Sequence, residues 1–507
     1  MNIEHVEKSY QELESDSTLQ NLIAQANARY ILYNTEESKE NFPRYTIKDE
    51  QLNILAFKYL NIGCNYFSEH NYLKASHSLE KGALILEYIH GSIHIQTKNK
   101  KLFCLISALS YYVCFQYSKA FILIGKLESD TMISSLVSLF LNRKFDQLLS
   151  EIDKLITNSS YGDEYLAEHF EEDNATKIYE IIIAKSLNYY VQFYQTGNKD
   201  FLEIAKKDLV NLQEVAAMRG EPDVWWVIRL LLLIIDGFKE SSLWYVLGNY
   251  FNTEDKLPLK YIQSLVYKNG SITELFLTQR NSLPKVLNNK QGSIVSIPTS
   301  SGKTRIGEIA ILNCLLNEPK AKILFIAPYR SLAYEIENSF DEIFSNLDVS
   351  VSHLYGGSLF SKLDERIIDE SSVIVATPEK AKALFRSNED ILSCIKLVII
   401  DEGHLLGTDK RLIVNEMFYE ELKYHVKANG GRFLLLSAVL PNAEDLSEWL
   451  TDSTDNVYKE NWRPSDERIG IMEWNGVSVN LNWKSTDAER NSFNPNFIRS
   501  EERRVGK

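Results

Sequence analysis

The sequence predicts two fold classes in one chain, an all-α N-terminal region followed by an α/β domain with a doubly wound, mostly parallel sheet. Helical periodicity continues from the first residue to about Tyr250, with few prolines and glycines. It breaks at residues 252–258, and beyond Tyr261 short β-rich runs alternate with helical segments. We therefore predict an all-α domain at 1–255 and an α/β domain at 256–465.

Two interpretations of the all-α region remain open. The packing positions of a tetratricopeptide hairpin are matched by Tyr59, Ile62, Gly63, Tyr66, Ala75, Leu79 and Gly82. A second unit with similar spacing contains Ala108, Tyr111, Ala120 and Ile124. Because Gly63 and Ala108 are too far apart for a regular repeat of this kind, a helical bundle explains the small residues equally well. Either arrangement could bind a protein partner or gate the α/β domain.

The α/β region contains apolar runs that we predict as buried strands of the sheet. These runs lie at Ile294, Ile323, Val349, Val373, Leu397 and Phe433. Helical patterns separate them, as right-handed crossovers between parallel strands require. Ligands bind such sheets at the carboxyl ends of the strands, so the residues that follow each run are the candidates for chemistry.

The first of these runs opens a candidate phosphate-binding loop. The strand ends at Pro298, and the helical pattern begins at Lys303. Between them lie the turn residues Thr299, Ser300, Ser301 and Gly302. Backbone N–H groups of such a turn converge on phosphate, Lys303 adds a positive charge, and the Thr304 hydroxyl can bind Mg²⁺. The strict motif has glycine where this chain has Ile297, and the alternative is an ordinary strand-to-helix turn.

A second stretch supplies the acids that a nucleotide site requires. KLVIIDEGH (residues 396–404) reads as a strand buried on both faces that delivers Asp401 and Glu402 at its carboxyl end. Asp401 is the candidate Mg²⁺ ligand. Glu402 is the candidate base that polarises the water attacking the γ-phosphate of ATP. Together with the loop, this pair argues against the alternative of a solvated strand end.

The order of these motifs resembles the superfamily 2 helicases of DEAD/DEAH type, in particular their Ski2-like branch. The resemblance covers roughly residues 276–464. Its motifs are PTSSGKT (298–304), APYRSLAYE (327–335), YGG (355–357), VIVATPEK (373–380), DEGH (401–404) and SAVLPN (437–442). It implies a RecA-like domain that uses ATP and Mg²⁺. The implied activity is that of an ATP-dependent helicase or translocase acting on single-stranded or partly duplex DNA or RNA.

The resemblance also implies roles for individual residues. Gln279 would read the adenine, with Phe276 as its stacking partner. One strand of nucleic acid would lie along Arg330, Gly356, Gly357, Thr377 and Lys380. His404 and Ser437 would couple the state of ATP to that strand, although Val439 departs from the threonine usual in this motif.

The C-terminal stretch leads to expectations about the length of the protein. NWRP (461–464) resembles the crossing to a second RecA-like domain, of which residues 466–498 would be the incomplete start. We therefore expect this chain to be truncated and inactive as a motor by itself. Residues 499–507 match, in frame, the translation of a widely used sequencing adapter, so we expect them to be a non-native tail.

Composition restricts the remaining classes of protein. A net charge of −14 argues against a generally basic nucleic-acid coat protein, but it permits a local basic groove. Five cysteines without CxxC spacing indicate reduced thiols and a cytoplasmic protein. The apolar run at 224–235 is too short for a membrane span and contains Arg229, so we predict a buried helix.

Two other functions compete with the helicase interpretation. One is a helical interaction or scaffold protein whose degenerate NTPase acts as a nucleotide-gated switch, as Ile297 and Val439 would allow. The other is a signalling P-loop ATPase. The TPEK and Gly-Gly elements argue against the latter, because a signalling switch needs no row of strand-binding residues.

Overall fold

The computed structural model describes eleven stretches of the 507-residue chain. They are 3–34, 48–91, 100–127, 131–158, 172–352, 362–387, 393–403, 410–438, 440–463, 469–474 and 479–484. The predicted positions Gly356, Gly357, His404 and Val439 lie outside these stretches, as does the tail at 499–507.

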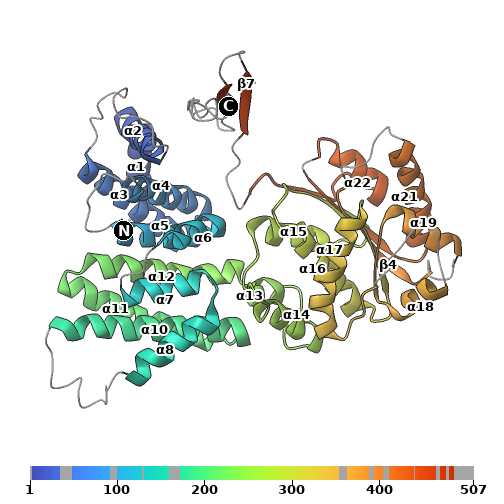
Figure 1. Ribbon diagram of the computed structural model, residues 1–507, viewed down its shortest axis with the longest axis horizontal. Helices are drawn as coiled ribbons and strands as arrows, with labels where there is room; N and C mark the ends of the chain where they lie inside the picture. The colour runs from blue at the N-terminus through green and yellow to red at the C-terminus, as the bar shows by residue number, and fades with distance from the viewer. Residues whose placement is uncertain are drawn as a thin grey trace, which may run out of the picture. The chain divides into compact units, whose positions relative to one another are not determined.

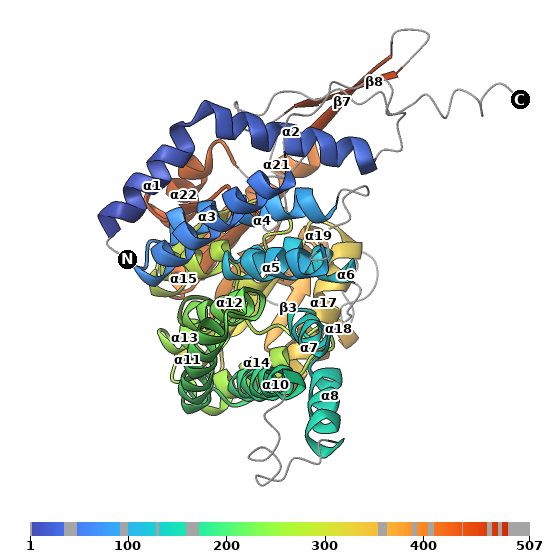
Figure 2. The same ribbon diagram turned by 90° about the vertical axis from the view of Figure 1, so that its left-hand side faces the viewer.

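The N-terminal region is helical, as predicted, and consecutive helices pack on one another (Figure 1). Its helices are α1 (Ile3–Ser15), α2 (Ser17–Asn34), α3 (Asp49–Ser68), α4 (Tyr72–His90), α5 (Lys100–Val113), α6 (Tyr117–Gly125), α7 (Met132–Leu141), α8 (Phe145–Asn158), α10 (Glu172–Thr196), α11 (Asp200–Arg219), α12 (Pro222–Ser241) and α13 (Leu243–Gly248). Helix α3 packs on α4, and α11 packs between α10 and α12, which Figure 2 shows nearly end-on. Helix α12 contains the apolar run and is largely buried, so the prediction of a buried helix is confirmed.

Small residues allow α3 and α4 to approach closely. A Cβ atom on Gly63 would lie 2.5 Å from the Leu79 side chain, and one on Gly82 would lie 2.7 Å from Leu60. Glycine is therefore the residue that fits at both crossings. Helical-hairpin repeats and bundles both use such contacts.

The α/β region contains a six-stranded parallel sheet with the strand order β3-β2-β4-β5-β1-β6. Its strands are β1 (Gly292–Ser296), β2 (Lys322–Ile326), β3 (Val373–Ala376), β4 (Ile395–Ile400), β5 (Arg432–Ser437) and β6 (Val457–Lys459). This confirms the predicted fold class.

The strand predicted at Val349 is wrong in the part that the structure describes. Val351 makes only one parallel bridge, to Val373 at the edge of the sheet. Beside it, the Ser352 hydroxyl accepts the N–H of Val375 at 2.9 Å, in the place where a strand would offer a carbonyl. A serine side chain thus replaces the next bond of the ladder. The sixth strand is β6, which the apolar pattern did not reveal because it is short and only half-buried.

Helices cover both faces of the sheet (Figure 1). They are α14 (Lys256–Val266), α15 (Leu277–Asn288), α16 (Lys303–Asn317), α17 (Arg330–Phe344), α18 (Lys362–Glu370), α19 (Pro378–Ser387), α21 (Lys410–Ala428) and α22 (Ala443–Thr451). Alternate strand residues face opposite cores. Phe325 packs in the core shared with α14 to α17, whereas Leu324 packs in the core shared with α18, α19, α21 and α22. This alternation explains why the strands read as continuous apolar runs.

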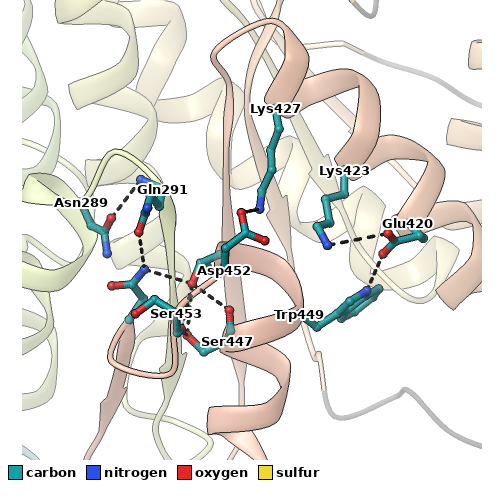
Figure 3. Close-up of polar contacts among 11 residues, drawn as sticks. Asn289, Gln291, Glu420, Lys423, Lys427, Ser447, Trp449, Asp452 and Ser453 are labelled. Carbon is teal, nitrogen blue, oxygen red and sulfur yellow. Dashed lines mark hydrogen bonds and ion pairs between the residues drawn. The ribbon is translucent and has the colours of Figure 1, made fainter.

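Polar contacts fasten α22 to the edge opposite the carboxyl ends of the strands (Figure 3). The Asn456 amide donates to Thr451 Oγ1 at 3.0 Å and to Gln291 Oε1 at 3.4 Å. Lys427, in the last turn of α21, pairs with Asp452 at the end of α22. These contacts fix the amino-terminal ends of β1 and β6, so the carboxyl ends of the strands can present their loops on a rigid sheet.

The chain forms two compact units, Met1–Trp462 and Arg463–Lys507. In the first unit the apolar core continues across the predicted boundary at residue 255, from the helical region into α14 to α16. In the second unit the structure describes an antiparallel pair, β7 (Ile469–Trp474) and β8 (Val479–Lys484). Among the described helices, none is both long and apolar enough to span a lipid bilayer.

A buried carboxylate joins the helical region to the α/β region. Glu274 lies just before α15, with its side chain 2% exposed and Arg143 Nη2 3.5 Å from its Oε2 atom. Its Oε1 atom accepts hydrogen bonds from the hydroxyls of Tyr117 at 3.1 Å and Ser241 at 2.9 Å, and its Oε2 atom accepts one from Tyr112. We call these five residues the Glu274 cluster.

Glu274→Ala is expected to lower the free energy of unfolding by about 3–5 kcal/mol, because it leaves the Arg143 charge without its buried partner. Urea denaturation followed by circular dichroism measures this loss. The matched control is Glu342→Ala, which removes a carboxylate that is 52% exposed and pairs with Lys268. That change should cost less than about 1 kcal/mol. Equal effects of the two substitutions would contradict the importance of the buried pair.

Candidate nucleotide site and nucleic-acid edge

The residues predicted to bind ATP follow β1 and β4 and meet at the carboxyl edge of the sheet. Strand β5 lies between these two strands, and all three run parallel. The loop after β1 leads into α16, which begins at Lys303, and Asp401 and Glu402 follow β4 directly. The topology therefore places the phosphate loop and the acidic pair on one side of the molecule.

The phosphate loop has the backbone conformation that a tight turn requires. Gly302 has φ 76°, and Ser300 has φ 67°, which is unusual for a residue with a side chain. The Gly302 carbonyl accepts a hydrogen bond from Gln279 Nε2 at 2.9 Å. A Cβ atom on Gly302 would lie 2.0 Å from that nitrogen, so both the backbone angle and the space require glycine.

Hydroxyl residues occupy the rest of the loop. Thr299 and Ser300 are exposed, whereas Ser301 is buried and its Oγ lies 3.5 Å from the Trp462 carbonyl, to which it donates. Thr304 lies in the first turn of α16, half-buried, one residue after Lys303. The N-terminal end of α16, with its unsatisfied N–H groups, is thus directed at the edge of the sheet where ligands bind.

Lys303 and Glu402 form an ion pair across the site. The lysine Nζ lies 3.1 Å from both carboxylate oxygens. The Lys303 side chain is 9% exposed and that of Glu402 is 24% exposed. A phosphate group entering the loop would compete with Glu402 for this cation.

Asp401 is buried and electrostatically perturbed. Burial, and then the neighbouring charge of Glu402, raise the pKa of Asp401 to about 6. Its Oδ1 atom accepts the Glu402 N–H at 2.9 Å. Glu402 has φ 51°, a left-handed conformation that costs of order 1–3 kcal/mol. Strain and a perturbed carboxyl group at one strand end are typical of a functional site.

A buried contact holds the phosphate-binding helix in place. Glu308, one turn into α16, pairs with Arg305 and accepts the Tyr261 hydroxyl of α14 at 3.1 Å. Burial raises the pKa of Glu308, and its partners compensate the charge. Helix α14 therefore fixes the direction of α16.

The predicted adenine-reading residues lie beside the phosphate loop. Gln279 is buried, and its Oε1 atom accepts the Phe276 N–H at 2.8 Å while its Nε2 atom bonds to the loop. The Phe276 ring has Tyr117 and Trp462 as neighbours, each with a centroid distance of 6.1 Å. The structure thus brings Phe276, Gln279 and the phosphate loop together.

The predicted coupling residue Ser437 ends β5 and is fully buried. Its carbonyl accepts the N–H of Ile297 at 3.1 Å. The next contact involves a residue that the sequence analysis did not identify. Ser296 Oγ donates to the Ala438 carbonyl at 3.3 Å and accepts the Leu440 N–H at 2.8 Å. Ser296 therefore ties the SAVLPN loop to the strand that carries the phosphate loop, and a lone serine within the apolar run 294–297 was its only signal.

The predicted nucleic-acid-binding residues that the structure describes, Arg330, Thr377 and Lys380, lie after β2 and β3, which are neighbours in the sheet. Arg330 is exposed at the start of α17. Thr377 and Lys380 are 8% and 7% exposed, and Thr377 Oγ1 accepts the Lys380 N–H at 3.4 Å. Thr377 thus caps α19, whereas Arg330 presents its charge to solvent.

The groups at the nucleotide edge suit a magnesium–nucleotide complex. Backbone N–H groups, the Lys303 ammonium and the N-terminus of α16 attract phosphate. The Asp401 carboxylate and the Thr304 hydroxyl offer the oxygen ligands that Mg²⁺ prefers. Fold and site together define a P-loop NTPase domain of the helicase type.

Comparisons with known proteins agree with this class. The sequence profile described as DEAD/DEAH box helicase matches residues 277–446. ATP-dependent DNA helicase Hel308 of Thermococcus kodakarensis is 33% identical over 218 residues, which make up 43% of this chain and 18% of that protein. The α/β region is therefore a DEAD/DEAH box helicase domain, and its resemblance to the Ski2-like branch is confirmed.

A longer match extends through the helical region. Hachiman protein HamB of Bacillus cereus is 41% identical over 500 residues, covering 98% of this chain and 44% of that protein. The chain thus spans less than half the length of this relative. Among solved structures, the helicase MrfA bound to DNA matches 39% of this chain and 29% of its own, with 19% identity and a TM-score of 0.35.

Proposed function

We propose that the chain is the ATP-binding part of an ATP-dependent nucleic-acid helicase or translocase. The observation that carries the proposal is the ion pair of Lys303 with Glu402, formed beside the buried Asp401 at the carboxyl edge of the sheet. It joins the phosphate-binding cation to the candidate catalytic carboxylate.

Each residue at this edge has one part in hydrolysis. The loop 299–302 and Lys303 hold the triphosphate, and Gln279 and Phe276 hold the base. Mg²⁺, bound through Asp401 and Thr304, would neutralise charge on the phosphates. Glu402 leaves Lys303 when phosphate takes its place and then orients and polarises the attacking water.

The strand of nucleic acid lies across the ends of β2 and β3, on the sheet that carries the nucleotide. Arg330 contacts a phosphate there, while Thr377 and Lys380 shape the start of α19. Ser437 and the Ser296 contact transmit the state of the nucleotide through the SAVLPN loop. Hel308 is named as a DNA helicase, so single-stranded DNA is the first substrate to test.

Nucleotide and strand binding can be tested on this chain, whereas we propose to measure turnover in a protein that also carries a second RecA-like domain. We expect calorimetry to detect binding of Mg-ATP to the chain alone. In the completed protein, single-stranded DNA or RNA should increase ATP hydrolysis. ATP binding without any stimulation by either strand would favour a nucleotide-gated interaction protein instead.

Arg330→Ala is expected to weaken binding of single-stranded oligonucleotides roughly tenfold, because it removes a charge-assisted contact to phosphate. The loss should be equal for oligonucleotides of different sequence, and the slope of log K against log salt should fall by about 0.7. Fluorescence anisotropy measures both. Arg386→Ala removes an exposed arginine at the far end of α19 and should change neither. A loss confined to one sequence would indicate base readout at Arg330.

A further inference from the structure

The Glu274 cluster connects the helical region to the base end of the nucleotide site. Glu274 precedes Phe276 by two residues, whereas its four partners all belong to the helical region. Tyr112, Tyr117 and Arg143 come from α5, α6 and the residues between α7 and α8, and Ser241 ends α12. Elements distant in the chain thus converge on one carboxylate.

Backbone pairing adds to this connection. The Leu243 N–H donates to the Thr273 carbonyl at 3.0 Å, and the Leu275 N–H donates to the Ser241 carbonyl at 2.8 Å. The segment before Phe276 is therefore paired with the α12–α13 junction on both sides of Glu274. Since the carboxylate is buried, moving this segment would break several hydrogen bonds and separate Arg143 from its counter-charge at once.

One member of the cluster also contacts the predicted base-stacking residue. The rings of Tyr117 and Phe276 stack with an interplanar angle of 29° and centroids 6.1 Å apart. Tyr117 is fully buried, and its hydroxyl bond to Glu274 fixes the orientation of its ring. The position of the Phe276 ring is thus set from the helical region as well as from α15.

We propose that Tyr117 is a positioning residue for the base of the nucleotide: held by Glu274, it supports the Phe276 ring from the side of the helical region. This inference rests on the proposed nucleotide site. It means that a change in the helical region alters how tightly the base is held, while the phosphate loop is unaffected. The helical region is then a part of the nucleotide site and not only an appended partner-binding module.

The test compares a nucleotide with its three phosphates alone, without the base and sugar. Binding of Mg-ATP and of inorganic tripolyphosphate to the full chain is measured by calorimetry. Tyr117→Leu removes the ring, and we expect it to weaken Mg-ATP binding by between about twofold and tenfold. Tripolyphosphate binding should stay within experimental error. Tyr117→Phe keeps the ring but loses the hydroxyl bond to Glu274, so its affinity for Mg-ATP should lie between that of Tyr117→Leu and that of the unaltered chain.

Tyr190→Leu is the matched control for loss of a large buried ring. Tyr190 is also fully buried in the helical region and donates to the Leu231 carbonyl at 3.0 Å. The Tyr190→Leu substitution should lower the melting temperature, but it should not weaken Mg-ATP binding more than tripolyphosphate binding. If Tyr117→Leu does not fold, Tyr117→Met removes the ring with a side chain that adapts to irregular space.

The outcomes separate this inference from the function on which it rests. Equal losses of Mg-ATP and tripolyphosphate binding in a folded Tyr117 variant, or no loss of either, would overturn the positioning role. A selective loss of Mg-ATP binding in Tyr190→Leu would overturn it as well. Failure of the unaltered chain to bind either ligand would instead refute the nucleotide site itself.

Discussion

Lys303→Ala is expected to weaken binding of Mg-ATP by up to about 100-fold, because a charge-assisted contact to phosphate contributes up to about 3 kcal/mol. The Lys303 side chain is 9% exposed and is the cation paired with Glu402. Its removal takes a positive charge away from that carboxylate and from Asp401 beside it, so the site becomes more negative where phosphate must enter. Calorimetry with Mg-ATP on the chain measures the loss.

Two comparisons make this prediction specific. Lys290→Ala removes an exposed lysine just before β1, at the end opposite the phosphate loop, and should leave ATP affinity unchanged. Inorganic tripolyphosphate should lose as much affinity as ATP in the Lys303 variant, since the lysine contacts phosphate and not base. If Lys303→Ala retained ATP affinity and melting temperature, the turn would be an ordinary strand-to-helix connection.

The parts of the fold that were predicted correctly depend on local patterns. The apolar runs at β1, β2, β4 and β5 are buried on both faces, so each is recognisable without knowledge of its neighbours. The run at Val349 has the same local appearance, but Ser352 lies at the sheet edge and bonds with its hydroxyl. Strand β6, in contrast, was not predicted. It is a strand because it pairs with β1, and its composition does not indicate this pairing.

The candidate site was predictable to the extent that topology brings strand ends together. Lys303 and Glu402 are 99 residues apart in the chain, yet the order of parallel strands places them in contact. Ser296 and Glu274 were missed, because their importance comes from the partners that surround them. A serine in a strand and a glutamate before a helix are common, and only the three-dimensional contacts distinguish these two.

Two of the residues predicted to contact nucleic acid, Thr377 and Arg330, differ in their structural surroundings. Thr377 belongs to the TPEK motif, but its hydroxyl caps α19, a role that a threonine before a helix commonly has. Arg330, in contrast, is exposed at the start of α17, where its charge can reach a phosphate. Arg330 is therefore the residue whose substitution should affect binding of a nucleic-acid strand, whereas Thr377 has a structural role at the start of α19.

Glu402→Gln is expected to reduce ATP hydrolysis by roughly 10²- to 10⁴-fold, the range that a positioned general base contributes. Glutamine keeps the size and shape of the side chain but cannot accept the proton of the attacking water. Binding of Mg-ATP should persist, because Lys303 loses only a competitor for phosphate. Turnover is measured by phosphate release in a protein completed by a second RecA-like domain, with single-stranded DNA present.

The control for this change is Glu421→Gln, which alters an exposed glutamate on α21 in the same domain. The protein with this substitution should hydrolyse ATP at the unaltered rate. The Lys303–Glu402 pair makes a second outcome informative. Since glutamine binds the lysine ammonium less strongly than a carboxylate does, ATP affinity should stay equal or rise, whereas Lys303→Ala should lower it. Two substitutions in one ion pair would then act in opposite directions on binding. Undiminished turnover in Glu402→Gln would mean that another group activates the water, and the role assigned to this carboxylate would have to be given up.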